Sequence, residues 1–284
     1  VEVAAGGTLS VATDRGRIRV ATWEQDRVRA QITKRADVFT EGEARKRFEA
    51  YPVHVTSQEA QVAITAKADG DRPRGLEVDV VLTVPTRFSV DLHTAGGDVE
   101  VGDLHGNVKA VTAGGRIGIG RIAAGSVAVQ TAGGDIAIAG IANGDGQAET
   151  AGGGIEVGDV SGDLTVRTAG GDITTGAVGG KLTTSTAGGG IHIGAGGASV
   201  QAETAGGDIR VDRAGGDVRA RTSGGGIQVG PSTGAVEAAT LGGDVEVGVA
   251  GGSVKASTAG GSIAVLGSGG PVEARTAGGS IAVS

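Results

Sequence analysis

The sequence predicts an all-β protein, a parallel β-solenoid in which short strands stack coil upon coil. The first observation is a four-residue unit, Thr-Ala-Gly-Gly, that begins at Thr94 and recurs at steps of 18, 19 and 19 residues and then of 18 residues seven times. A fixed period of this kind is typical of repeat proteins, whose units bury their apolar faces only against neighbouring units. The second observation is that 57 of the 284 residues are glycine. Each interior glycine costs a helix about 1 kcal/mol, which excludes a helical repeat.

The threonine that opens each unit is the most regular position in the chain. Nine copies read Thr-Ala-Gly-Gly, one reads Thr-Ser-Gly-Gly and one reads Thr-Leu-Gly-Gly. The eleven threonines are Thr94, Thr112, Thr131, Thr150, Thr168, Thr186, Thr204, Thr222, Thr240, Thr258 and Thr276. In a stack of coils, equivalent residues lie about 4.8 Å apart, so we predict a structural ladder of threonines.

Each coil divides into two halves of nine residues, and each half is a glycine-rich corner followed by a short alternating run. Alternation of β-branched and polar residues indicates a strand, and paired glycines allow tight corners. In one coil, Leu164, Val166 and Thr168 share one parity, and Ile173 begins the inward set of the next strand. The threonines are therefore predicted to point inward, with hydroxyls that bond to each other and to corner backbone. Two strands per coil are favoured, and a three-sided coil is the alternative.

Residues 1–88 differ in composition from the repeats and contain all five aromatic residues. Alternating runs at 18–20 and 28–32 indicate strands around a turn, and 53–55 and 61–66 indicate a hairpin. Thr40 followed by Glu43 fits a capping box, so a short helix is expected at about 42–51, before Pro52. We predict two domains, a β-rich amino-terminal cap at 1–88 and a solenoid of about eleven coils at 89–284.

Composition and charge limit the classes of function. A net charge of −7 argues against a nucleic-acid partner, and the absence of cysteine excludes disulfides. No apolar run is long enough to span a membrane, and no signal peptide is present. The chain also lacks an initiator methionine, so we expect a processed, mature chain that has lost its signal peptide.

Metal binding and catalysis find little support in the motifs. Calcium-binding nonapeptide repeats need Gly-Gly-x-Gly-x-Asp, whereas here aspartate follows Gly-Gly directly and the further glycine is missing. We therefore expect each such aspartate to bond its own turn backbone, and we expect no metal and no cofactor. The four histidines are scattered and accompany no pattern of a nucleophile with its orienting acid, so an enzyme is not expected.

The runs at 16–20 (GRIRV), 78–85 (VDVVLTVP) and 89–101 (SVDLHTAGGDVEV), followed by tandem TAGGDI units, resemble the bacterial putative-adhesin family of β-strand-repeat proteins of unknown function. The resemblance covers essentially the whole chain. It implies an extracellular or cell-surface location in the bacterial envelope and a non-enzymatic role. It brings no catalytic residues with it.

The asymmetry of the chain suggests its function. An aromatic-bearing cap stands at one end, and the last coil repeats the pattern of the earlier ones in full, so its edge is expected to pair with another subunit. We predict a structural protein that self-associates end to end and forms a fibre or a surface layer. The residues predicted to form this contact are Val1, Val3, Leu9, Val11, Thr276, Ser280, Ile281 and Val283.

The alternative is a monomeric adhesin-type binding module that recognises a surface glycan or protein. A regulatory or scaffold role in the envelope is a third possibility, which the residues do not separate from the other two. In the first two cases the chain needs no membrane span of its own.

Overall fold

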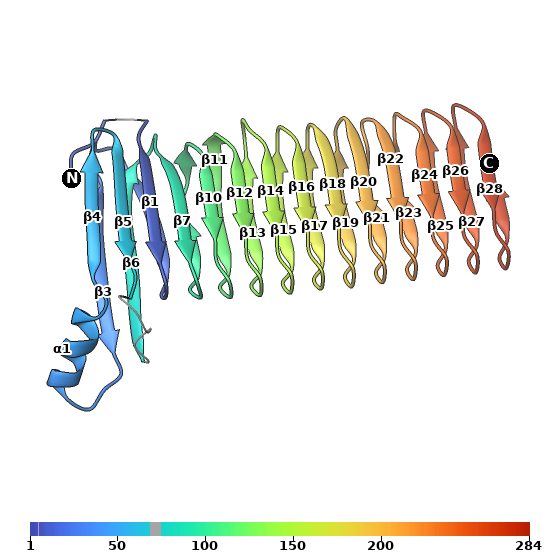
Figure 1. Cartoon of the computed structure of the whole chain (residues 1–284). Coiled ribbons are helices and arrows are strands. Elements are labelled where there is room, and N and C mark those ends of the chain that lie inside the picture. The colour runs from blue at the N-terminus through green and yellow to red at the C-terminus, as the bar shows by residue number, and fades with distance from the viewer. Residues whose placement is uncertain (5, 69–74) are drawn as a thin grey trace. The chain divides into compact units, whose positions relative to one another are not determined.

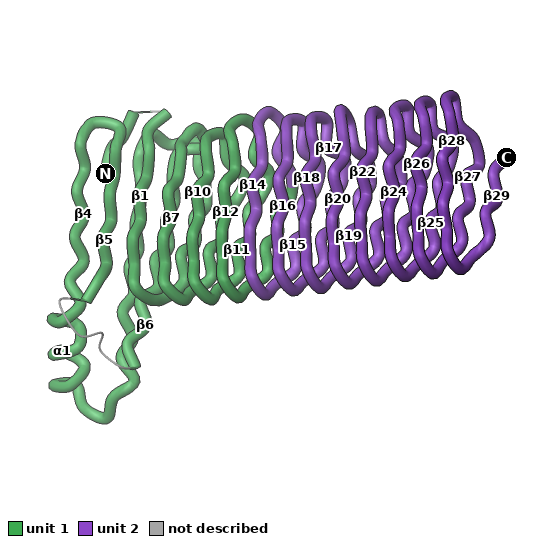
Figure 2. The backbone as a smooth tube through the Cα atoms, turned by 45° about the vertical axis from the view of Figure 1, so that its right-hand side comes forward, with its two compact units in different colours: residues 1–139 green, residues 140–284 purple. Residues whose placement is uncertain are grey.

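A computed structural model describes residues 1–4, 6–68 and 75–284 and confirms a mostly-β, parallel solenoid with one short helix near the amino terminus (Figure 1). The chain divides into two compact units, residues 1–139 and residues 140–284 (Figure 2). Strand β13 (Ile136–Ile141) includes residues of both. The division of the chain at residue 88 stays a prediction.

Unit 2 is built from coils that each contribute one strand to each of two sheets. The strands of one sheet are β14 (Gly146–Glu149), β16 (Leu164–Arg167), β18 (Lys181–Ser185), β20 (Ser199–Glu203), β22 (Asp217–Arg221), β24 (Val236–Ala239), β26 (Val254–Ser257) and β28 (Val272–Arg275). The strands of the other are β15 (Ile155–Val160), β17 (Ile173–Val178), β19 (Ile191–Gly196), β21 (Ile209–Val211), β23 (Ile227–Val229), β25 (Val245–Ala250), β27 (Ile263–Ser268) and β29 (Ile281–Val283).

The strands of unit 2 are parallel, and each residue faces its equivalent in the next coil. Leu164 is opposite Leu182, and Ile173 is opposite Ile191. The two-sheet arrangement corresponds to two strands per coil rather than three. Several strands of the second sheet bend. In β15, Val157 and Val160 are both buried, although residues three apart would point to opposite faces of a straight strand. Aliphatic side chains at equivalent positions stack in columns and form most of the core.

Unit 1 also contains two sheets, and in them the strand order differs from the chain order. The first sheet runs β12 (Val127–Gln130), β10 (Val108–Val111), β7 (Ser89–Thr94), β1 (Thr8–Thr13), β5 (Gln61–Ala66) and β4 (Val53–Gln58). The second runs β11 (Ile117–Ala124), β8 (Val99–Val101), β2 (Ile18–Trp23), β6 (Leu76–Pro85) and β3 (Arg29–Ala36), and β9 (Leu104–His105) pairs with β11.

The segment between β2 and β7 thus folds back along the far side of the first coil. Strands β5 and β6 pair parallel with β1 and β2, and β7 and β8 pair parallel with the same two strands on their other sides. The predicted hairpin of β4 and β5 is confirmed, since the two strands pair antiparallel. The strands expected around a turn at 24–26 exist, but each pairs with β6 instead of with the other, because β6 lies between them.

The predicted helix is present as α1 (Glu41–Glu49). It begins one residue before the expected start and ends two before the expected end. Thr40 caps it by accepting a hydrogen bond from the Glu43 amide at 3.3 Å, as the capping-box pattern predicts. The aromatic residues of unit 1 differ in burial, because Tyr51 and Phe88 are fully buried, Phe39 is fully exposed, and Trp23 and Phe48 are half-buried. Among the described residues, no helix is long and apolar enough to cross a membrane.

Candidate functional site

The predicted threonine ladder lies at one corner of the coils. Ten of its eleven members, Thr94 to Thr258, are buried, and Thr276 is half-buried. The Thr168 hydroxyl donates a hydrogen bond to the Gly153 carbonyl of the preceding coil at 2.8 Å, and it accepts one from the Gly171 amide at 3.3 Å. Thr186 and Thr204 repeat the same pair of bonds. The hydroxyl proton therefore goes to corner backbone rather than to the next threonine.

The glycines of this corner are required by the closeness of the coils. A Cβ atom placed on Gly171 would lie 2.2 Å from the carbonyl oxygen of Gly153, which is the atom that accepts the Thr168 hydrogen bond. The same contact recurs at Gly189 and Gly207. Threonine and the second glycine thus act together, because one satisfies the corner carbonyl and the other allows the coils to approach it.

The aspartate after Gly-Gly bonds the next coil rather than its own turn. The Asp172 carboxylate accepts a hydrogen bond from the Gly190 amide at 2.7 Å, and Asp208 accepts one from the Gly226 amide at 2.7 Å. The expectation that each aspartate bonds its own turn is therefore wrong, because stacking brings the equivalent amide of the next coil within reach. No group of three metal-ligating side chains occurs in the part of the chain that the structure describes.

The residues predicted to mediate self-association fall into two sets. In unit 1, Leu9 and Val11 are fully buried in β1, which pairs with β5 on one side and with β7 on the other. Val3 is buried, and Val1 is exposed with its amino group bonded to the Val28 carbonyl at 2.9 Å. Strand β1 therefore has no free edge for another chain.

The carboxyl-terminal set lies on or beside exposed strands of unit 2. Ile281 and Val283 belong to β29 and are 46% and 51% exposed. Thr276 donates to the Gly261 carbonyl, and Ser280 donates from its amide to the Ser262 hydroxyl at 3.3 Å. Strand β29 pairs only with β27, and β28 only with β26, within the described residues. These two strands therefore each present one unpaired backbone edge.

A second candidate surface is a polar ridge across four strands of unit 2, formed by His192, Arg210, Asp212, Gln228 and Glu246. Their side chains form a hydrogen-bonded chain. His192 Nε2 lies 3.1 Å from Asp212 Oδ2, Arg210 Nε donates to Asp212 Oδ1 at 2.8 Å and Arg210 Nη1 donates to Gln228 Oε1 at 2.6 Å. Gln228 Nε2 then donates to Glu246 Oε2 at 3.2 Å. The hydrogen bond from His192, followed by that from Arg210, lowers the pKa of Asp212.

A groove of about 340 Å³ runs beside this polar ridge. Its lining includes Pro231, Val249 and Leu266, and the last two are 58% and 57% exposed. Charged groups on one side and aliphatic groups on the other suit an amphipathic ligand lying across the strands. No motif in the sequence marks these residues as a site, although Val249 and Leu266 are apolar at positions where most coils carry small or polar residues.

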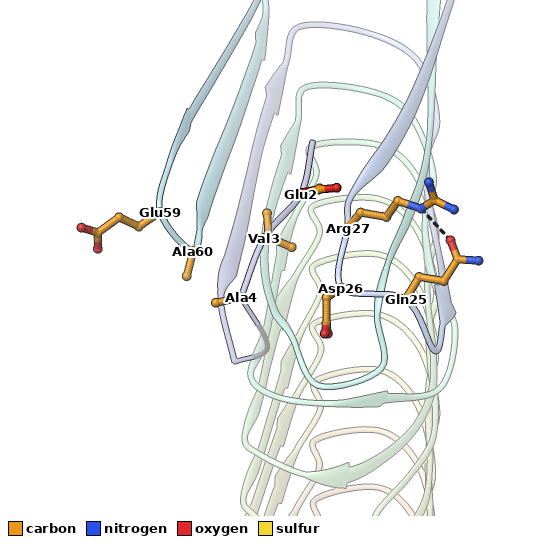
Figure 3. Close-up of a pocket in the computed structure, with 8 residues that line it drawn as sticks. All are labelled: Glu2, Val3, Ala4, Gln25, Asp26, Arg27, Glu59 and Ala60. Atoms are coloured by element: carbon orange, nitrogen blue, oxygen red, sulfur yellow. Dashed lines mark hydrogen bonds between the residues drawn. The ribbon is translucent and has the colours of Figure 1, made fainter.

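A second hollow lies in unit 1 and is shown in Figure 3. Residues Glu2, Val3, Ala4, Gln25, Asp26, Arg27, Glu59 and Ala60 line it. Arg27 donates to the Gln25 side chain at 2.6 Å, while Glu59 points away from the hollow (Figure 3). The Arg27 guanidinium also lies 5.2 Å from the centre of the Trp23 ring, whose indole donates to the Arg27 carbonyl at 2.8 Å. Trp23 is thus engaged by its own turn.

The repeat pattern and the fold agree with a family comparison. The model of the family described as Toastrack DUF4097 matches residues 18–265. The chain belongs to this family.

Three solved structures also resemble the chain. A putative adhesin from Bacteroides fragilis NCTC 9343 is 13% identical, with a TM-score of 0.26 over 100% of this chain and 94% of that one. A putative adhesin from Parabacteroides distasonis ATCC 8503 is 14% identical, with a TM-score of 0.30 over 100% and 94%. A putative lipid binding protein from the same strain is 12% identical, with a TM-score of 0.30 over 100% and 95%. No curated protein matches this sequence.

One member of the threonine ladder escaped the sequence analysis of this toastrack chain. Thr13 is buried and lies opposite Thr94 in the register of β1 and β7. Its hydroxyl donates to the Arg15 carbonyl at 2.7 Å and lies 3.1 Å from the Tyr51 hydroxyl. The run Thr13 to Val20 (TDRGRIRV) keeps the threonine, one glycine and the alternation of Thr94 to Val101 (TAGGDVEV), and this weaker match is the signal that would have identified it.

Proposed function

We propose that the protein is a non-enzymatic component of the bacterial cell surface that associates with other copies of itself through unpaired sheet edges, building a fibre or a surface layer. The observation that supports this function is the pair of strands β28 and β29, which each pair on one side only within the described chain. Ile281 and Val283 of β29 are half-exposed. An open strand edge with exposed aliphatic side chains readily accepts a strand from another chain.

The proposed contact keeps the carboxyl-terminal residues of the predicted one and differs in the strand of the second copy that they meet. Strand β1 is paired on both sides, so Leu9 and Val11 offer no free edge, and in this proposal the partner of β28 and β29 is a strand at a sheet edge of another copy. Ile281 and Val283, which the sequence analysis assigns to the contact, remain part of the proposal.

Electron microscopy and light scattering at micromolar concentration test this function. The double variant Ile281→Lys/Val283→Lys introduces charge at β29 and is expected to abolish assembly. The matched control Thr174→Lys/Gln147→Lys adds the same charge on exposed positions of strands that are paired on both sides. Assembly that survives the first variant as well as the control would overturn the proposal.

The alternative function is that of a monomeric adhesin-type module, and the groove beside the polar ridge supports it. A surface glycan or peptide bound there would contact Arg210 on one side and Leu266 on the other. Titration of the chain with bacterial surface polysaccharide, followed by its melting temperature, tests this function. We expect a rise in the melting temperature that Leu266→Asp removes and that Thr174→Asp leaves unchanged.

A further inference from the structure

Strand β4 is an open edge of unit 1 that depends on no terminus of the chain. It is the last strand of its sheet and, among the described residues, pairs with β5 alone. Val53 is half-buried, and the other five residues of the strand are exposed. The strand reads VHVTSQ, without Lys, Arg, Asp or Glu. The strand therefore presents no carboxylate, lysine or arginine side chain to repel another strand.

The pairing of β5 determines which backbone groups of β4 are free. The Ala60 and Ala66 carbonyls, at the two ends of β5, accept hydrogen bonds from the Thr8 and Asp14 amides beside β1, at 2.9 and 3.3 Å. Because backbone groups alternate in direction along a strand, residues 61, 63 and 65 direct theirs toward β4. Their partners in the register are residues 58, 56 and 54. The backbone groups of Val53, Val55 and Ser57 therefore face the open edge.

Strand β3, which ends the other sheet of unit 1, is protected in the way that edge strands commonly are. It carries Arg29, Lys34 and Arg35, and helix α1 contacts it. Lys34 Nζ donates to the Phe48 carbonyl at 3.0 Å and to the Tyr51 carbonyl, which ties the strand to the end of the helix. Charged residues and a covering helix discourage pairing with other chains. Strand β4 has neither device.

Val55 shows which face of β4 a partner would cover. It lies opposite Ile64 of β5, whose side chain is fully buried, so both side chains project from the core-side face of the sheet. Val55 is nevertheless 49% exposed. A strand added beside β4 would shield an aliphatic side chain that the fold leaves half-covered.

We propose that β4 docks the β4 strand of a second copy, antiparallel and about a two-fold axis that passes beside Val55. In this register Val55 faces its own equivalent, and Val53 faces the equivalent of Ser57. Each of the three facing pairs then exchanges two backbone hydrogen bonds. The register is self-complementary, since no charged pair is opposed and valine meets valine at its centre. This inference rests on the proposed function, association through sheet edges, and adds a second contact to it.

The geometry favours a second copy over an unrelated strand because the edge matches itself. A two-fold contact uses the same patch on both chains and closes after two subunits. Chains that also associate through β28 and β29 would be linked at two different places, and this combination extends into a fibre. A chain with only one of the two contacts would form closed dimers when that contact is two-fold.

A single cysteine tests the register directly, because the chain contains no cysteine of its own. Facing residues of a hydrogen-bonded antiparallel pair have Cα atoms about 5.5 Å apart, within the range that a disulfide spans. Under mild oxidation we expect Val55→Cys to form a covalent dimer. The matched control Thr56→Cys should not, because residue 56 faces residue 54 of the second copy. Equal cross-linking of both variants, or of neither, would overturn the proposed register.

A charge-swap experiment tests the two-fold symmetry without relying on one variant's folding. Both variants also carry Ile281→Lys/Val283→Lys, which prevents association through the edge at β28 and β29. We expect Val55→Lys and Val55→Glu each to be monomeric by sedimentation, because like charges oppose one another, and an equimolar mixture to form one-to-one dimers. A mixture that stays monomeric at about 100 µM, a concentration at which even small interfaces associate, would overturn this inference. The proposed function would still stand if the chain without these substitutions assembles.

Discussion

The threonine corners and strand β4 differ in how far their backbone amide and carbonyl groups are hydrogen-bonded. At the corner, the Gly153 carbonyl and the Gly171 amide are both bonded by Thr168, and the coils approach so closely that only glycine fits. At β4, the backbone groups along one side of the strand have no partner strand in the described chain. The difference shows that the backbone groups of one coil find their hydrogen-bond partners in the neighbouring coil. Stability therefore depends on the continuity of the stack, and the association that we propose uses strands at which that continuity stops.

The largest loss of stability is expected when the close approach of two coils at the threonine corner is disrupted. In Gly171→Ala the new Cβ would meet the Gly153 carbonyl, a backbone atom that cannot move independently, so we expect the free energy of unfolding to fall by about 3 kcal/mol. Urea denaturation measures the change. Gly118→Ala is the matched control, since nothing lies within 4 Å of its added Cβ, and it should stay within about 0.5 kcal/mol of the wild type. Similar losses in both variants would contradict the steric argument.

A smaller loss is expected when the corner keeps its shape but loses its hydroxyl. Thr168→Val is nearly isosteric and removes the bonds to the Gly153 carbonyl and from the Gly171 amide, which should cost about 2 kcal/mol. Thr174→Val, on an exposed position of β17, serves as the control and should be nearly neutral. Urea denaturation again measures the change. An unchanged free energy of unfolding in Thr168→Val would show that the hydrogen bonds of the hydroxyl contribute no stability.

A gain in stability, rather than a loss, is expected from replacing one buried threonine of strand β17. Thr175 is 3% exposed, and its hydroxyl has no hydrogen-bond partner among the residues that the structure describes. Replacing it by valine removes a buried polar group and keeps the volume, so Thr175→Val should stabilise the protein by about 1 kcal/mol. The melting temperature should rise accordingly. A fall would mean that the hydroxyl is satisfied after all.

The smallest effect should come from the exposed charges on the sheet face. Arg221, followed by Arg219, bonds Glu237 and lowers the pKa of its carboxyl group. Because the folded-state pKa lies below the unfolded value, this pairing contributes stability above about pH 4.5 and loses it as the pH falls further. Glu237→Gln should therefore flatten the acid limb of a stability-against-pH curve slightly. An unchanged curve would indicate that solvent screens the pair completely.

The repeats could be predicted in detail because one rule applies to every coil. A period of 18 residues, the alternation of Ile173 and Thr175 and the position of Thr168 before two glycines determine strand, corner and inward face by local chemistry. The hydrogen-bond partner of Asp172 could not be found in the same way, because that bond reaches the Gly190 amide 18 residues away. The polar ridge was missed for a related reason, since its residues come from four successive coils and meet only when these are in register.

By itself, the sequence determined the kind of coil, the inward threonines and the short helix, because each follows from contacts within a few residues or from strict repetition. Only the tertiary structure decided that β5 and β6 lie beyond β1 and β2, leaving β4 as an open edge. Parallel strands with similar alternation can pair in more than one order, and nothing local distinguishes one order from another. In the observed order Tyr51, Phe88 and most aliphatic residues of β1, β2, β5 and β6 are buried. This burial depends on packing between strands that are distant in the sequence.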